Sequence, residues 1–366
     1  MKFRKPNEKT LVLNPCSPID PMKTTQEFVS FYRSRLVPVI DELEETRKRF
    51  VKTIRFACWG AAGALVLGMF ITIFSDSPEV EVVRDPNANP GGPAEQRIYY
   101  GGAFGNVLIL VIIGGVVGYK FWFKPKKEEL KTRFKNEVMG RMVKFIDESL
   151  EFDRRLGISR SEYDQSKIFL TSGDRYMCKD LVTGKLGATA IRFSEVHTQK
   201  EERDDGDKES SWVTLFEGIV FVADFNKNFK GRTVVLTDQA EKAFGSLGTM
   251  LQKMNMKRDP LIKMENTTFE KAFAVYGSDP VEAHYILSPS LMDRILLIKA
   301  KAGKIELSFV DSKVFVAIPN RKDLFEANVF SSFTSYSTLE SYSNTLQLIA
   351  GIVDDLNLNN RIWTKE

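Results

Sequence analysis

The sequence predicts an α+β integral membrane protein with two transmembrane helices, extended by an antiparallel helical stalk, and a cytoplasmic α+β domain of mixed, mainly antiparallel strands. Two long apolar segments predict the membrane helices, and amphipathic segments beside them predict the stalk. Short strand patterns separated by turn residues predict the domain. The expected divisions are an extended tail (1–23), a cytoplasmic amphipathic helix (24–52), transmembrane helix 1 (53–75), an external loop (76–102), transmembrane helix 2 (103–123), a cytoplasmic stalk helix (124–157) and the α+β domain (158–366).

Both apolar segments are long enough to span a membrane. The first, residues 53 to 74, has about 19 residues without a charge after Arg55, which crosses a hydrocarbon core of about 30 Å at about 1.5 Å per residue. The second, residues 103 to 123, has no charge before Lys120. Soluble helices of this length normally keep a polar face, so two buried helices of a soluble core are the weaker interpretation.

Charge predicts the orientation of these segments. Basic residues flank them and acidic residues are concentrated between them, so the positive-inside rule places both termini in the cytoplasm. The proline-, asparagine- and glycine-rich loop predicts a mobile connector with little capacity to fold. The flanking basic residues are Arg47, Lys48, Arg49, Lys52, Lys124, Lys126 and Lys127.

Small residues recur four positions apart in both segments. This spacing lets helix backbones approach closely in lipid, so we expect the two helices to pack together, with a homo-oligomer or a pore as a wider use of the same faces. No ionisable residue lies in mid-membrane to mark an ion path, which makes a channel the weaker alternative. The small residues are Gly60, Ala64 and Gly68, then Gly101 and Gly105, then Gly114 and Gly118.

Two amphipathic stripes predict the stalk. Thr24 and Glu27 have the spacing of a capping box, which predicts a helix start, and Pro38 is expected to bend that helix. Burying the stripes against each other gives a stalk of roughly 35 to 40 Å, whereas the alternative lays one or both helices on the membrane surface. The stripes are Phe28, Tyr32, Leu36, Val39, Leu43, Phe50 and Ile54, and Leu130, Phe134, Val138, Met142, Phe145, Ser149 and Leu156.

The segment after residue 157 alternates strand and helix patterns. Ser159 and Glu162 predict a short capped helix, and residues 212–225, apolar on both alternating faces, predict a central strand. The other expected elements are strands at 174–179, 188–198, 232–236 and 269–276, a turn at 183–187, a helix at 238–253, a broken helix at 280–302 restarting behind Ser288, a hairpin at 304–319 around Asp311, and a helix at 338–356.

The sequence contains no recognisable catalytic motif. Its only histidines, His197 and His284, have no metal-ligand spacing. No phosphate-binding loop, nucleophile elbow or dinucleotide fingerprint occurs. We therefore expect no catalytic residue, no cofactor and no metal. The net charge of +4 is concentrated beside the membrane segments, which favours lipid contact and argues against nucleic acid as a partner.

One polar cluster is the best candidate for a binding site. Its members follow a predicted strand end or precede a predicted helix. A Glu and a His two positions apart on a helix do not face one direction, so we do not expect Glu282 and His284 to act together. Capping and turn formation are the simpler roles. The cluster comprises Asp224, Asn226, Lys227, Asp279, Glu282 and His284.

Four sequence strings carry a resemblance to a known family. They are FEGIVFVADFNKNFKGRTVVL (216–236), VYGSDPVEAHYILSPSLMDRIL (275–296), SFVDSKVFVAIP with DLFEAN, and LNLNNRIW (356–363). Together they resemble the bacterial family called domain of unknown function 3137, over nearly the whole chain. The resemblance implies a two-span protein of the bacterial inner membrane, no established activity, and a LemA-type membrane protein as partner. That family more often carries Arg at position 284, which weakens His284 as a base.

The combined prediction is a membrane-anchored cytoplasmic binding or scaffold protein without catalytic activity. It would dock a protein, lipid or small ligand near the inner membrane, with the lipid bilayer itself as a partner. One alternative is a membrane-bound hydrolase or transferase that uses the region from Asp224 to Lys227. The other is an oligomeric channel.

Overall fold

The computed structural model describes residues 23–75, 79–83, 95–99, 102–170, 173–203, 210–237, 258–320 and 325–359. The chain divides into two compact units. The hairpin unit comprises Arg35–Met139 and Glu326–Ser335, and the sheet unit comprises Met1–Ser34, Gly140–Phe325 and Tyr336–Glu366. The predicted domain at 158–366 is therefore interrupted, because ten residues of it group with the helices. The predicted tail lies outside the described residues up to position 22.

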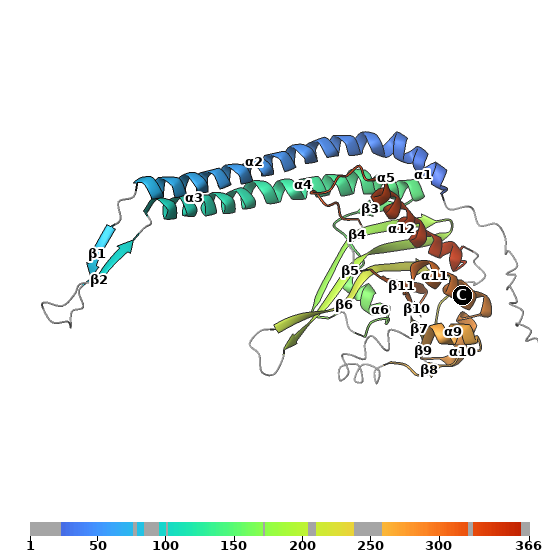
Figure 1. Ribbon diagram of the computed structural model, residues 1–366. Coiled ribbons are helices and arrows are strands. Elements are labelled where there is room, and N and C mark those ends of the chain that lie inside the picture. The colour runs from blue at the N-terminus through green and yellow to red at the C-terminus, as the bar shows by residue number, and fades with distance from the viewer. Residues whose placement is uncertain are drawn as a thin grey trace, which may run out of the picture. The chain divides into compact units, whose positions relative to one another are not determined.

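Two helical arms form the hairpin unit (Figure 1). The first arm is α2 (Val37–Ser75). The second consists of α3 (Gly102–Gly118), the π-helical turn η2 (Tyr119–Phe123), α4 (Lys124–Phe134) and the π-helical turn η3 (Lys135–Met139). Helix α2 packs against α3, α4 and η3. The stalk helices therefore pair with each other, as predicted.

Burial changes sharply along this hairpin. In the stalk, Leu43 is 0% exposed and Leu130 is 1% exposed, so the two predicted stripes meet. In the apolar segments the large side chains face outward, with Trp59 76% and Leu110 68% exposed. The helical stretches Thr25–Ile71 and Gly105–Ile146 are long and apolar enough to cross a membrane, and 6% and 0% of their apolar windows are buried.

The close approach of the two arms depends on one glycine. A Cβ added at Gly68 would lie 2.9 Å from Cγ1 of Val107. At Gly60, Gly105, Gly114 and Gly118, an added Cβ would meet no atom of the described residues within 4 Å. The predicted small-residue packing is thus seen at Gly68, where the absence of a side chain allows α3 to approach α2 closely.

Two π-helical turns precede prolines. Turn η1 (Tyr32–Leu36) comes before Pro38, and η2 comes before Pro125. Proline cannot donate to the carbonyl four residues earlier, and its ring crowds that carbonyl. In both cases that carbonyl belongs to the π turn, whose wider backbone accommodates the proline. Pro38 was expected to bend the helix, and the structure shows a local change of helix type before it.

The loop between the apolar segments contains regular structure. Strands β1 (Glu79–Val83) and β2 (Glu95–Tyr99) pair antiparallel, with Val80 opposite Ile98. The expectation of a connector without capacity to fold is wrong for these residues. The alternating, β-branched sequence of 79–83 favours a strand, a signal outweighed in the prediction by the proline and glycine content nearby.

The first described element of the sheet unit is a capped helix. In α1 (Thr25–Phe31), Thr24 and Glu27 form the predicted capping box. Helix α5 (Gly140–Ile146) lies beside it, since the rings of Phe31 and Phe145 stack with centroids 4.3 Å apart. The predicted stalk helix at 124–157 therefore ends too late, and its true end is residue 146.

Asp147 explains this earlier end. Its Oδ1 accepts a hydrogen bond of 2.8 Å from the Ser149 amide, and its carbonyl accepts one of 3.1 Å from the Leu150 amide. Such local bonds offer the backbone an alternative to the helix. Leu156, placed on the apolar stripe by the prediction, is 55% exposed.

A nine-stranded antiparallel sheet forms the body of this unit, which confirms the predicted α+β class (Figure 1). Its order is β3-β4-β5-β6-β11-β10-β7-β9-β8. The strands are β3 (Glu151–Asp153), β4 (Arg175–Leu186), β5 (Thr189–Arg203), β6 (Ser210–Asp224), β7 (Arg232–Thr237), β8 (Leu261–Ile262), β9 (Phe273–Gly277), β10 (Glu306–Val310) and β11 (Lys313–Pro319).

Strand β6 lies inside the sheet, between β5 and β11. Val220, Phe221 and Val222 are each 2% exposed or less, so consecutive residues are buried on both faces and the predicted central strand is confirmed. The turn expected at 183–187 comes later, because β4 continues to residue 186 and Gly187, at φ +59°, makes the turn. The predicted hairpin turn at Asp311 is present, with φ 56°.

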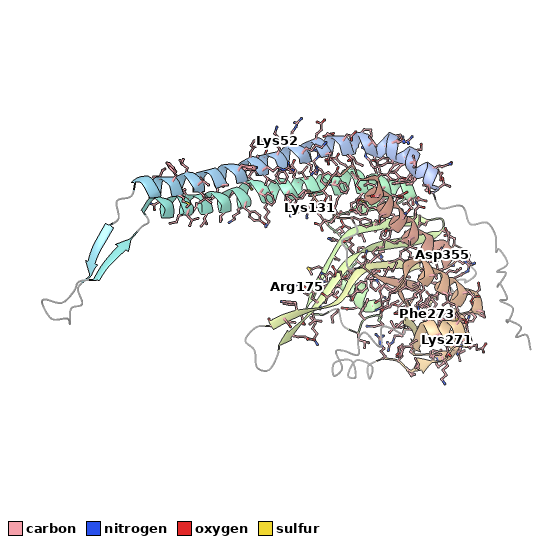
Figure 2. All side chains as sticks on the ribbon, viewed as in Figure 1. Lys52, Lys131, Arg175, Lys271, Phe273 and Asp355 are labelled. Carbon is pink, nitrogen blue, oxygen red and sulfur yellow. The ribbon has the colours of Figure 1, made fainter. Side chains whose placement is uncertain are left out.

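Helices cover the sheet. One face packs on Tyr163 of α6 (Arg160–Gln165). In a second layer, Ile295 of α11 (Pro289–Ala302) and Ile349 of α12 (Tyr336–Asp355) are 0% exposed. Figure 2 shows Asp355 on α12, which pairs with Lys301 of α11. Two further helices among the described residues are α9 (Thr267–Ala272) and α10 (Pro280–Ile286).

Caps decide where several of these helices begin. Ser288 caps α11 and Ser159 caps α6, as predicted. The prediction of a strand at 269–276 is wrong for its first half, which is helical. Asn266 accepts hydrogen bonds of 3.0 Å from the amides of Thr268 and Phe269 and so starts helix α9. The helix expected at 238–253 lies outside the described residues.

Candidate functional site

The predicted polar cluster lies where the β6–β7 connection meets the start of α10. Asp224 Oδ1 accepts a hydrogen bond of 3.0 Å from the amide of Asn226, whose φ is 56°. Asp279 caps α10, and its Oδ1 accepts 2.9 Å from the amide of Val281. These three polar residues shape the turn and the helix start.

Glu282 ties the two segments together. Its carboxylate accepts hydrogen bonds from the amides of Lys230 and Gly231, at 2.9 and 2.6 Å. Lys227 lies over the ring of Tyr285, with Nζ 3.6 Å from the ring centroid. Burial lowers the pKa of Lys227, and the nearby charge of Glu282 partly opposes this.

The structure therefore brings Lys227, Asp279 and Glu282 to one junction, with Asp224 and Asn226 in the adjoining turn. His284 is exposed on α10. The oxygens of the three carboxylates hydrogen-bond backbone amides, which is the behaviour of capping residues. A binding role for the cluster stays a prediction.

A separate cleft of about 500 Å³ lies on the α6 side of the sheet. Arg232 Nη2 donates to Asp259 Oδ1 at 2.8 Å, and its Nε also bonds this carboxylate. Arg258 donates to the carbonyl of Ile168 at 3.0 Å. The lining residues are Asp164, Lys167, Phe169, Leu170, Arg232, Val234, Arg258, Asp259 and Tyr276.

The cleft combines charge with aromatic surface. The guanidinium of Arg258 lies 5.5 Å from the ring centroid of Tyr276, and Phe169 stacks on Tyr163 with centroids 4.9 Å apart. Burial raises the pKa of Glu306, and the charges of Lys304 and Arg258 partly oppose that rise. The sequence prediction missed this cleft, because its walls come from segments far apart in the chain.

The basic residues predicted to flank the membrane have different surroundings. Lys52 and Lys131 mark the two arms in Figure 2. Lys48 and Lys124 are exposed, and Lys127 Nζ lies 6.0 Å from the ring centroid of Phe123. Arg49 pairs with Glu45, and Lys126 pairs with Glu129. Lys52 lies near the ring of Phe56. The exposed members keep their charge available to an anionic surface.

Arg47 is the exception, because it belongs to a buried ion pair. Its Nη2 lies 2.6 Å from Oε1 of Glu44, and the two side chains are 11% and 5% exposed. Burial raises the pKa of Glu44, but hydrogen bonds from Arg47 and from the Phe333 amide outweigh it and leave the pKa lowered.

This ion pair holds residues Glu326–Ser335, which we name the clasp segment. Arg47 Nη1 donates to the carbonyl of Val329 at 3.3 Å, and the Phe333 amide donates to Glu44 Oε2 at 3.0 Å. Lys131, in α4 of the second arm, pairs with Glu326 of the clasp segment. The ring of Phe333 lies 5.1 Å from that of Phe134.

Sequence reasoning missed the clasp segment as well. One signal was present: Glu44 stands four residues after the buried Ile40, on the apolar side of α2. A carboxylate in that position needs a buried partner. The partner amide lies 289 residues away, so no local pattern pointed to it.

The described residues contain no group of three or more His, Cys, Asp or Glu side chains that could hold a metal ion. The molecule is thus an α+β sheet unit joined in one chain to an apolar helical hairpin. Residues 214–358 match the family described as "Protein of unknown function (DUF3137)", which confirms the resemblance over this segment. The match runs from β6 through the clasp segment to the end of α12.

A solved structure also matches, the mycobacterial trehalose monomycolate transport factor A, TtfA. The identity is 11%, the TM-score is 0.28, and the match covers 54% of this chain and 86% of that chain. A likeness at this TM-score bears on neither fold nor function. None of the curated proteins matches the sequence.

Proposed function

We propose that the chain is a membrane-anchored binding protein without catalytic activity. Its hairpin crosses the bacterial inner membrane twice, both termini lie in the cytoplasm, and the sheet unit binds a ligand near the membrane. The observation that carries this proposal is the outward display of apolar side chains on both helices, with 6% and 0% of their apolar windows buried.

Water is an unfavourable surrounding for such helices. Burying one large apolar side chain is worth roughly 1.5–3 kcal/mol, and soluble monomers rarely expose continuous apolar patches of more than a few hundred Å². Phe56, Leu67 and Phe70 are 65%, 60% and 57% exposed along the first arm. A lipid bilayer supplies the missing apolar contact, and the basic flanks place the stalk on the cytoplasmic side.

The cleft supports the binding part of the proposal. Its lining contains three cationic side chains, Lys167, Arg232 and Arg258, and two acidic ones, Asp164 and Asp259. Three cationic against two acidic side chains leave the lining with a net positive charge, although Arg232 is paired with Asp259. With the rings of Phe169 and Tyr276 beside them, the suitable ligand is an amphipathic molecule with an acidic group, either a small metabolite or a lipid.

Two protein partners extend this proposal. A LemA-type membrane protein follows from the family resemblance, and a second copy of the chain follows from the small-residue faces at Gly60 and Gly114. Both would meet the hairpin in the membrane. Neither is required for the cleft to bind its ligand.

Purification from the native host in mild detergent, without overexpression, tests the binding function. Native mass spectrometry should find an acidic amphipathic molecule bound in stoichiometric amount, and Arg258→Gln should lose it. The control is Lys271→Gln, on the exposed surface of α9, which should retain it. Equal retention by both variants, with unchanged circular dichroism, would contradict binding in the cleft.

A further inference from the structure

We propose that the clasp segment places Phe330 in the interfacial layer of the bilayer, so that the C-terminal half of the chain contacts lipid beside the two membrane helices. This inference rests on the proposed membrane anchoring. It adds a third point of contact, which comes from the part of the chain that carries the sheet and not from the apolar segments.

Ring contacts fix the position of Phe330 along the hairpin. Its ring stacks on Phe123 with centroids 6.4 Å apart. Phe123 in turn stacks on Phe50 at 5.6 Å and on Tyr119 at 5.3 Å. Phe330 therefore lies at the level of η2, where the apolar part of the second arm ends and the lysine-rich part begins.

The clasp segment uses its two phenylalanines differently. Phe333 is 5% exposed and packs on Phe134, whereas Phe330, three residues earlier, is 56% exposed. Packing within the hairpin unit thus accounts for Phe333 and leaves most of the Phe330 ring uncovered. Tyr119, Phe121 and Trp122 are 59%, 72% and 43% exposed at the same level.

The chemistry around Phe330 fits a membrane interface. Lys120 Nζ lies 5.8 Å from the ring centroid of Phe121, and Lys127 Nζ lies 6.0 Å from that of Phe123. Aromatic rings interleaved with lysines at the end of an apolar helix are typical of the headgroup layer, where the lysines meet anionic lipids. Continuity with the outward-facing apolar helices favours lipid over a protein as the occupant.

The buried ion pair holds the clasp segment in this place. Glu44 accepts from the Phe333 amide and Arg47 donates to the Val329 carbonyl, so the backbone is fixed on both sides of Phe330. The position of the ring therefore depends on Glu44. Removing that carboxylate should free the segment while leaving every aromatic residue in the chain.

Single-tryptophan chains test the inference. In a background with Trp59, Trp122, Trp212 and Trp363 changed to Phe, Phe330→Trp is placed in vesicles of phosphatidylcholine and phosphatidylglycerol whose acyl chains carry bromine near the headgroup. We expect its emission to be blue-shifted and strongly quenched. Adding Glu44→Gln should reduce both effects.

The control is Asp41→Trp in the same background. Asp41 is exposed on α2, nine residues before Phe50, which is about 13 Å further along the stalk. It should show unshifted, unquenched emission. If Phe330→Trp behaves like Asp41→Trp, the inference is overturned, and a protein partner remains for the exposed ring.

A third chain separates this result from the proposed anchoring. It retains only Trp59, which lies in the first apolar segment, and is placed in vesicles with bromine deep in the acyl chains. Quenching of Trp59 together with Phe330→Trp supports both proposals. Quenching of Trp59 alone overturns the interfacial contact and leaves the anchor standing, and quenching of neither overturns both.

Discussion

The hairpin unit and the sheet unit use the same apolar side chains in opposite ways. Phe56 and Trp59 of the hairpin are 65% and 76% exposed, whereas Phe221, Phe309 and Phe315 of the sheet are 0% exposed. The hydrophobic effect drives such residues away from water in both cases. In the sheet unit these side chains are buried inside the unit, whereas in the proposed membrane anchor lipid would cover those of the hairpin. The comparison therefore tests whether the two units are stable in different solvents.

Substitution in the sheet core should have the largest effect. Phe309→Ala removes a fully buried ring from β10 and should cost about 3–5 kcal/mol of unfolding free energy. The matched change in the hairpin, Phe56→Ala, leaves no cavity. Chemical denaturation in mild detergent, followed by circular dichroism of the strands, measures the difference. Equal losses would show that the two units do not differ as described.

A charge in the second apolar segment should have the next largest effect. Leu110→Lys places an ammonium on a residue that is 68% exposed, at a cost of about 2.5–3.5 kcal/mol in the middle of a bilayer. Less protein should remain in carbonate-washed membranes. Val281→Lys, 80% exposed on α10, is the control and should fractionate like the wild type. Identical behaviour of the two variants would argue against a bilayer around α3.

Opening the buried ion pair of the hairpin should be milder. Glu44→Gln keeps the shape of the side chain but removes the charge that Arg47 and the Phe333 amide bond, at a cost of about 1–3 kcal/mol. Hydrogen exchange at the Phe333 amide should accelerate. Glu45→Gln, whose side chain is 72% exposed, should leave that exchange unchanged. An unaltered exchange rate at the Phe333 amide in Glu44→Gln would show that Glu44 does not hold the clasp segment.

The smallest expected effect is the change of stability with pH, which has opposite signs in the two units. The pKa of Glu44 is lowered in the folded protein, so its stabilisation is present above the unfolded pKa and is lost as pH falls through the folded pKa. The pKa of Glu306 is raised by burial, so stability of the sheet falls as pH rises from the unfolded to the folded pKa. Acid should therefore loosen the clasp and favour the sheet.

Protection factors, corrected for intrinsic exchange, measure both trends in one sample. The Phe333 amide reports the clasp, and amides of β10 report the sheet. Glu44→Gln should remove the first trend alone, and Glu306→Gln the second alone. Trends of the same sign in both units would contradict the assigned pKa directions.

Local signals predicted much of this structure from the sequence. The capping box of Thr24, the cap of Ser288 and the turn at Asp311 are all present, because each depends on residues only a few positions apart. The outward apolar helices follow from composition alone. The antiparallel sheet and its central strand β6 follow from short apolar runs and turn residues.

Competing local effects explain the predictions that failed. Asp147 ends the stalk helix although the apolar spacing continues, and Asn266 starts a helix inside a strand-like pattern. The strands β1 and β2 were hidden by nearby prolines and glycines. In each case a side chain or a β-branched pair outweighed the average character of the segment.

Long-range contacts explain what the sequence could not predict. The bond between Arg47 and the Val329 carbonyl joins residues 282 positions apart, and Asp164 and Arg258 line the same cleft. In the predicted polar cluster, Asp224 and Asp279 act locally on their own turn or helix, whereas Glu282 bonds the amides of Lys230 and Gly231, about 50 residues away. A site whose residues are brought together by folding cannot be recognised from local sequence patterns.

Labelling of single cysteines in intact cells tests the central claim most directly. In a chain with Cys16, Cys58 and Cys178 changed to Ser, Asn89→Cys lies in the loop between the apolar segments, and Val281→Cys lies in the sheet unit. An impermeant maleimide should label Asn89→Cys in intact cells and Val281→Cys only after the membrane is permeabilised. Labelling of both, or of neither, before permeabilisation would contradict a hairpin that crosses the inner membrane twice with the sheet in the cytoplasm.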